Sequence, residues 1–172
     1  MNIKFLATLS LFVIFFCCKQ KQETNLPDNK DENISQDISE KDLSKLNYIE
    51  FTLDEKTAKA IADWNEYNEL QTIATNVKKG DLSYFDNDED PIKVLIKNSK
   101  QTIPNAVNTE PTLARITALE TKLYKLENLS NLSTTSKKEL TESIREFLES
   151  FSNLNFQMNK KLEKDSQNIE KP

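Results

Sequence analysis

Apolar residues recur at helical spacing along most of the chain after residue 50. Two long stretches show this most clearly, one over residues 113–129 and one over residues 140–162. Spacings of three and four place such residues on one face of a helix. The pattern therefore predicts one helix from about 109 to 130 and another from Ser136 to about Lys164. Their apolar positions are Leu113, Ile116, Leu119, Leu123, Leu126 and Leu129, then Leu140, Ile144, Phe147, Phe151, Leu154, Met158 and Leu162.

The same spacing predicts a helix nearer the N-terminus, beginning near Thr52. Thr52 and Glu55 have the spacing of a capping box, and Lys78 and Gly80 supply a cation and a glycine at the expected end. Ile61 and Ile73 fall off the main face, which indicates contact with two neighbours. The main face consists of Ala60, Trp64, Tyr67, Leu70, Ala74 and Val77.

A shorter helix is predicted to begin at Asp90 and Pro91, a favourable N-cap followed by a favourable first residue. Its apolar side holds Ile92, Leu95 and Ile96, and Ser136 with Glu139 forms a second predicted capping box. Residues 46–53 are expected to form an extended arm packed on the helices, with a short strand as the alternative. The chain is thus predicted to be all-α, an up-and-down bundle of three or four helices over residues 46–165.

The segments outside this domain are polar or carry a targeting signal. Residues 18–45 lack aromatic side chains and are rich in charge, so we expect a disordered tether, and residues 166–172 are expected to fray. Residues 1–17 combine a basic start at Lys4 with a short apolar run and end at Cys17, which Cys18 follows. The run is shorter than the roughly 20 residues that a spanning helix needs. These features predict a lipoprotein signal peptide, with an ordinary secretory signal and an uncleaved anchor as the alternatives.

The two cysteines compete as the lipidation site. Signal peptidases need small residues beside the cut, and bulky Phe16 precedes Cys17, whereas Cys17 itself precedes Cys18. Cys18 is therefore the predicted lipidated residue, with Cys17 as the alternative. This predicts a palmitate-bearing membrane protein.

Composition argues against several kinds of activity. The chain has no histidine and a net charge of −5, which disfavours nucleophilic catalysis, zinc or haem ligation and nucleic-acid binding. Asp86, Asp88 and Asp90 have the spacing of an EF-hand start, but Pro91 and Lys97 occupy the positions that need glycine and glutamate. We therefore expect no catalytic residue, no cofactor and no metal, and classify the chain as a non-enzyme.

Three stretches resemble small lipoproteins of Bacteroidetes, especially flavobacteria: the signal end at residues 15–19, and residues 111–127 and 150–164. The resemblance carries no activity with it. It implies an anchor in the outer membrane, and Lys19 and Lys21 after the cysteines favour the periplasmic face over the cell surface. Spirochaete lipoproteins share this kind of signal and composition and remain an alternative.

A lipid-anchored protein that acts through protein contacts in the cell envelope is the function that these features favour. Arg115, Tyr124 and Lys125 are the candidate partner surface, although Arg115 could instead form a salt bridge between helices. One alternative is a periplasmic module that binds a small ligand in a cleft near Trp64 and Tyr67. Another is a toxin-immunity or inhibitor lipoprotein.

Overall fold

The computed structural model describes residues 38–86 and 90–167. Several predicted segments lie outside these ranges. They are the signal and its cysteines, most of the tether, residues 87–89 between Asp86 and Asp90, and residues 168–172 of the tail. All the described residues belong to one compact unit.

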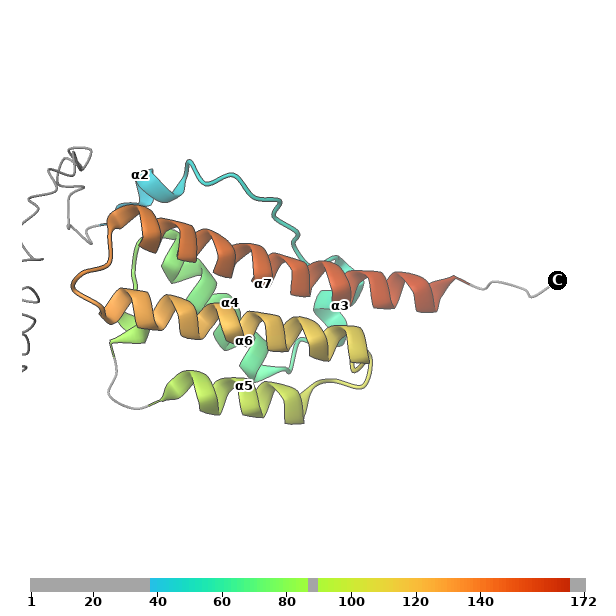
Figure 1. The fold of residues 1–172 in the computed structure, drawn as a ribbon. Coiled ribbons are helices and arrows are strands. Elements are labelled where there is room, and N and C mark those ends of the chain that lie inside the picture. The colour runs from blue at the N-terminus through green and yellow to red at the C-terminus, as the bar shows by residue number, and fades with distance from the viewer. Residues whose placement is uncertain (1–37, 87–89, 168–172) are drawn as a thin grey trace, which may run out of the picture. The chain divides into compact units, whose positions relative to one another are not determined.

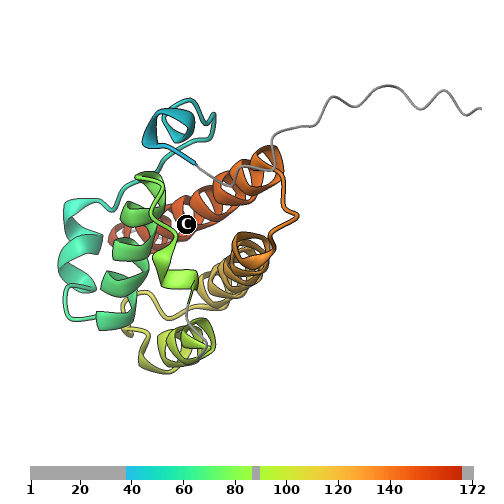
Figure 2. The same cartoon turned by 90° about the vertical axis from the view of Figure 1, so that its left-hand side faces the viewer.

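The predicted all-α fold is confirmed, since every regular element of the described residues is helical (Figure 1). Four helices form an up-and-down bundle: α4 (Asn65–Lys78), α5 (Pro91–Thr102), α6 (Glu110–Asn131) and α7 (Lys137–Ser166). Each packs against the next, and α4 also packs against α7, so the ring closes. Viewed along the bundle, the four surround one core (Figure 2). Shorter elements are α2 (Glu40–Leu43), α3 (Glu55–Ala60) and the 3₁₀ turn η2 (Ser83–Phe85).

The starts of α5 and α7 and the end of α4 follow the local chemistry that the sequence predicts, with one partial exception. The Asp90 carboxylate accepts from the N–H of Lys93 and begins α5, and the Ser136 hydroxyl accepts from the N–H of Glu139 and begins α7. The return bond of the predicted Ser136 box is absent among the bonds of the described residues. Gly80 ends α4 at a φ of 85°, and a Cβ there would lie 2.5 Å from the Ile38 carbonyl oxygen. A side chain is excluded at this position both by the backbone angle and by the close approach.

The predicted helix from Thr52 to Gly80 is wrong as a single element. Asp54 rather than Thr52 is the N-cap of α3, where its carboxylate accepts from the N–H of Thr57 at 2.6 Å. The chain leaves the helix after Ala60 and re-enters it at Asn65. Ile61 and Trp64, at the two ends of this break, are both buried.

The predicted tether extends too far into the domain. Ile38 and Leu43 are buried, and the Ser39 and Asp42 side chains form the capping box of α2. Lys137 at the start of α7 pairs with Asp42 at 2.8 Å, and this contact together with the Ser39 hydrogen bonds lowers the pKa of the Asp42 carboxyl. Residues 38–45 therefore belong to the folded unit, because apolar side chains and an ion pair hold them against it.

The core consists of the predicted stripes. Every predicted apolar residue of α7 is buried, and so are the central four of α6, whereas Leu113 and Leu129 are half-buried at the edge. Trp64 and Tyr67 are each only 2% exposed, which makes them core residues. Ion pairs between neighbouring helices, such as Lys100 with Glu120 at 2.6 Å, lie outside this core.

Replacing Leu123 or Phe147 by alanine is expected to lower the free energy of unfolding by about 2–5 kcal/mol, because both side chains are fully buried and truncation leaves a cavity. Chemical denaturation measures the loss. Val94→Ala at an exposed position of α5 is the control and should change stability by less than about 0.5 kcal/mol. Equal stabilities of all three variants would contradict the assigned core.

Candidate functional site

The predicted extended arm is confirmed and borders a groove of the described domain. Residues 46–54 contain no helix or strand and run along α7 in the direction from its N-terminus towards its C-terminus (Figure 1). The arm lies between α2 and α3, so both of its ends are fixed by short helices.

Three polar side chains of α7 hold the arm by its backbone. The Ser152 hydroxyl accepts from the N–H of Phe51 at 2.6 Å and donates to the carbonyl of Ile49 at 2.8 Å. Asn155 donates to the Phe51 carbonyl at 3.0 Å. Asn159 donates to the Thr52 carbonyl at 2.8 Å and accepts from the N–H of Asp54 at 3.1 Å. These residues, spaced three and four apart, share one side of the helix and act as the partner that a sheet would otherwise supply.

Asn155 also joins the arm to α4. The Tyr67 hydroxyl donates to its side-chain oxygen at 2.8 Å, so one buried amide contacts α4, α7 and the arm. Burial raises the pKa of the Tyr67 phenol well above its usual range, although the hydrogen bond to Asn155 acts in the opposite direction. Tyr67 therefore stays protonated and donates over the whole physiological pH range.

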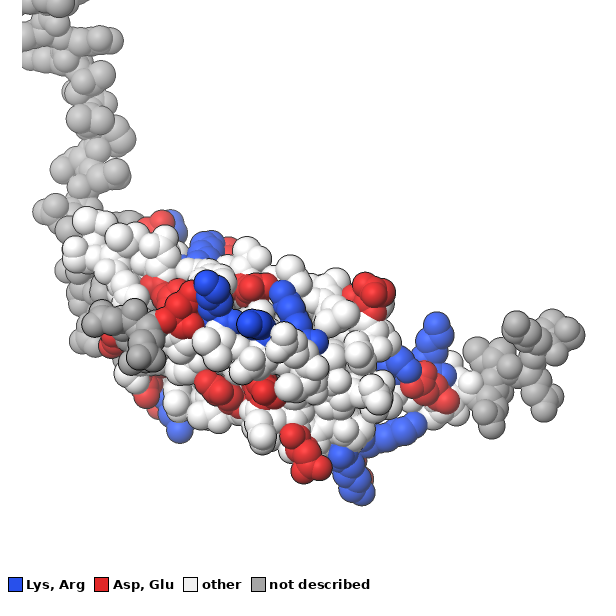
Figure 3. Space-filling model, turned by 90° about the horizontal axis from the view of Figure 1, so that it is seen from below, with Lys and Arg blue, Asp and Glu red and all other residues white. Residues whose placement is uncertain are grey.

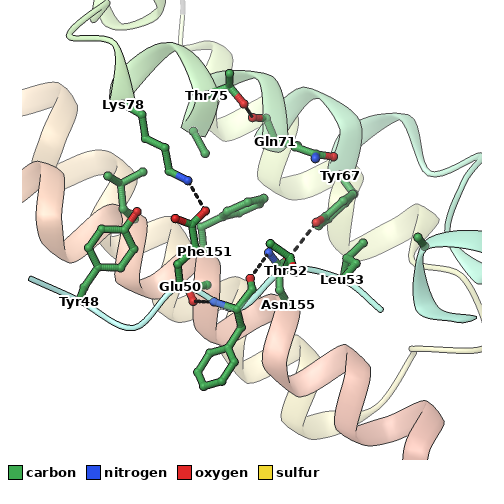
Figure 4. A pocket seen from close by; sticks show the side chains of 15 residues that line it. Tyr48, Glu50, Thr52, Leu53, Tyr67, Gln71, Thr75, Lys78, Phe151 and Asn155 are labelled. Atoms are coloured by element: carbon green, nitrogen blue, oxygen red, sulfur yellow. Dashed lines mark hydrogen bonds and ion pairs between the residues drawn. The ribbon is translucent and has the colours of Figure 1, made fainter. Parts of the chain in front are cut away.

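The groove between the arm, α4 and α7 has a volume of about 410 Å³ (Figure 4). Its floor contains the stacked rings of Tyr67 and Phe151, whose centroids are 5.7 Å apart. Gln71 and Lys78 line the wall on α4, and Glu50 of the arm faces Lys78.

An ion pair between Lys78 and Glu50 closes one end of this groove, with Tyr48 beside it. Burial tends to lower the pKa of Lys78, but the contacts with Glu50 and Tyr48 outweigh it and raise that pKa. Burial is also the largest cause of the raised pKa of Tyr48. Lys78 and Glu50 thus already neutralise each other. The side-chain amide of Gln71, which also lines the groove, makes no hydrogen bond within the described residues.

The opposite side of the arm is apolar. Ile49 is 71% exposed and points to the same side of the arm as Phe51, two residues further on. The Phe51 ring packs on Phe156 of α7, with centroids 4.6 Å apart, and Lys160 lies over the Phe156 ring. We call Ile49, Phe51 and Phe156 the arm face.

The predicted partner surface on α6 does not form one patch. Arg115 and Tyr124 lie nine residues apart on one straight helix, which places them on opposite sides of it. Tyr124 is half-buried and lies near the Asp90 carboxylate, and its pKa is raised by burial and by neighbouring acids. Lys125 pairs with Glu146 of α7 at 2.9 Å. Arg115 is exposed and makes no ion pair within residues 38–86 and 90–167, so the predicted interhelical bridge is not formed there.

The predicted ligand cleft at Trp64 and Tyr67 is not formed either. Tyr67 lines the groove beside the arm, whereas Trp64 lines a separate hollow at the turn between α3 and α4. The indole N–H of Trp64 donates to the Thr102 hydroxyl at 3.2 Å, which is a structural contact between α4 and α5. Sequence reasoning missed the α7 residues that hold the arm, and the polar Ser152, Asn155 and Asn159 next to apolar core positions were the available signal.

The described residues contain no cluster of acidic or cysteine side chains suited to a metal ion. None of the helices within residues 38–86 and 90–167 has the length and hydropathy needed to cross a bilayer. Acidic and basic side chains alternate over the face drawn in Figure 3, without a large region of one sign. Comparisons with protein-family models, curated proteins and solved structures found no match to the chain.

Asn155→Ala is expected to cost about 1–3 kcal/mol of stability and to release the arm, because the Tyr67 hydroxyl and the Phe51 carbonyl both lose their partner. Denaturation gives the stability, and hydrogen exchange at Phe51 and Asp54 reports the arm. Asn153→Ala is the matched control on the same helix, since the half-buried Asn153 makes no hydrogen bond within the described residues. Slow exchange in the arm of Asn155→Ala would contradict this role.

Proposed function

We propose that this chain is a lipid-anchored protein of the bacterial cell envelope that acts by binding another protein. The anchor is proposed from the sequence of residues 1–19, with Cys18 as the lipidated residue and the periplasmic face of the outer membrane as the location. The contact is proposed from the domain: the arm face presents apolar side chains that the core does not use. A binding role also fits the groove chemistry, because the charged residues there are already paired.

The arm face is the observation that carries the proposal. Ile49 and Phe156 are two of the four large apolar side chains exposed in the described residues, the others being Val94 and Leu132. Phe156 packs on the half-buried Phe51 ring, and Ile49 lies two residues before Phe51 in the arm. By contrast, Val94 lies on α5 and Leu132 lies after α6. Apolar side chains gathered at one place on a surface are typical of contact sites.

A small-ligand role is less well supported by the same geometry. The groove has sufficient volume for a small molecule, but Lys78 is paired with Glu50, and Asn155 with Tyr67 and Phe51. A polar ligand would have to break these pairs in order to be recognised. Binding of a protein at the arm face would break none of these pairs.

Lipidation is tested by metabolic labelling with a clickable palmitate in a bacterial host that processes lipoproteins. The wild-type chain and Cys17→Ser should be labelled, whereas Cys18→Ser should not, because Cys18 is the expected acceptor. If Cys18→Ser is labelled and Cys17→Ser is not, Cys17 carries the lipid. An unlabelled wild-type product would overturn the anchor.

The contact surface is tested by quantitative recovery of cross-linked envelope proteins. The double variant Ile49→Asp with Phe156→Asp should reduce partner recovery by about tenfold or more, since both apolar contacts are replaced by charge. Arg115→Glu tests the surface predicted on α6 in the same experiment, and Val94→Asp controls for added charge elsewhere. If Arg115→Glu reduces partner recovery and the double variant does not, the contact surface lies on α6.

A further inference from the structure

Over residues 48–51 the arm bonds to α7 through only one of its two backbone edges, whereas further on the C=O of Thr52 and the N–H of Asp54 bond to Asn159 of α7 as well. The N–H and C=O of Phe51 and the C=O of Ile49 bond to side chains of α7. In an extended chain these groups alternate between the edges from one residue to the next. The backbone groups of Tyr48 and Glu50 therefore point away from α7, and among residues 38–86 and 90–167 they make no hydrogen bond.

The side chains around this free edge alternate as well. Those of Leu46, Tyr48 and Glu50 line a hollow beside Lys78, whereas that of Ile49 points outwards and has the greatest exposure of the large apolar side chains described. An extended segment with open N–H and C=O groups is a template for pairing with another chain. Water reaches it on one side, and a β-branched residue suited to strands lies at its centre.

We propose that this edge pairs antiparallel with the same edge of a second copy of the chain, with the two-fold axis at Ile49. Tyr48 then lies opposite Glu50 of the second copy as a hydrogen-bonded pair. Ile49 lies opposite Ile49 in the non-hydrogen-bonded position, where side chains approach most closely. The contact is isologous, as most homodimer contacts are.

A second copy fits this edge better than an unrelated strand because the arm complements itself. The pairing buries Ile49 against its own equivalent. Glu50 enters the interface with its charge already held by Lys78. The antiparallel register also brings the Lys45 end of one arm beside the Asp54 end of the other, so opposite charges meet at both ends. This inference rests on the proposed function only in taking the arm as a contact surface.

Cysteine cross-linking tests the register in the chain from residue 19 onwards, which lacks the native cysteines and retains the compact unit formed by the described residues. Ile49→Cys should form a disulfide-linked dimer about tenfold faster than Asn47→Cys, because only the residue on the axis meets its equivalent at disulfide distance. Asn47 is also exposed on the same arm, and its equivalent would lie roughly 13 Å away. Equal rates, or no dimer from either variant, would overturn the pairing.

Sedimentation equilibrium tests the backbone bonds. Glu50→Pro should abolish self-association, because proline lacks the N–H at the free edge and leaves the α7 bonds in place. Glu50→Gln, which loses the ion pair and keeps the N–H, should still associate. Circular dichroism confirms that both variants are folded. Association of Glu50→Pro equal to that of the wild type contradicts the proposal, as does a monomeric wild type.

The two proposals fail in different ways. If Ile49→Cys does not cross-link but the arm-face aspartates still reduce partner recovery, the second copy is not the occupant and the protein-contact function stands. If the cross-link forms while recovery of every other protein is unchanged by the aspartates, the arm serves self-association alone.

Discussion

The candidate site depends on one interaction, in which side chains of α7 bind the backbone of the extended arm. Ser152, Asn155 and Asn159 replace the neighbouring strand that residues 49–54 would otherwise need. A buried backbone amide without a partner is costly, so the arm can lie on α7 only where that helix presents polar atoms at matching intervals. The groove, the arm face and the free edge all exist because the arm is held in this way.

Asn155 gives this interaction its link to the bundle. Its amide receives the Tyr67 hydroxyl and bonds to the arm, so the positions of α4 and the arm relative to α7 are coupled through one side chain. The aromatic rings of Trp64, Tyr67 and Phe151 stack in sequence behind it. Polar and apolar contacts therefore meet at one point of α7, which explains why the groove forms there.

Helical periodicity was sufficient to predict α5, α6 and α7, because each has a continuous apolar stripe and a recognisable N-cap. It failed at residues 61–64, since Ala60, Trp64 and Tyr67 keep spacings of four and three across the break and hide it. It also missed α2, where Ile38 and Leu43 are isolated apolar residues in a polar segment. Such residues become informative only when the surface that buries them is known. The arm was predicted as extended, but the α7 residues that bind it were not.

By itself the sequence determined the helical class, the up-and-down order and the residues of the core, because periodic burial is a local property of the chain. It also supplied the signal and cysteine pattern from which the membrane anchor is proposed. Only the tertiary structure decided which polar residues meet. Asn155 and Phe51 lie far apart in the chain, and no local rule joins them. The same holds for Arg115 and Tyr124, which sequence placed on one surface and helix geometry separates. Contacts of this kind depend on how whole helices pack, and periodicity carries no information about the partner that each face will meet.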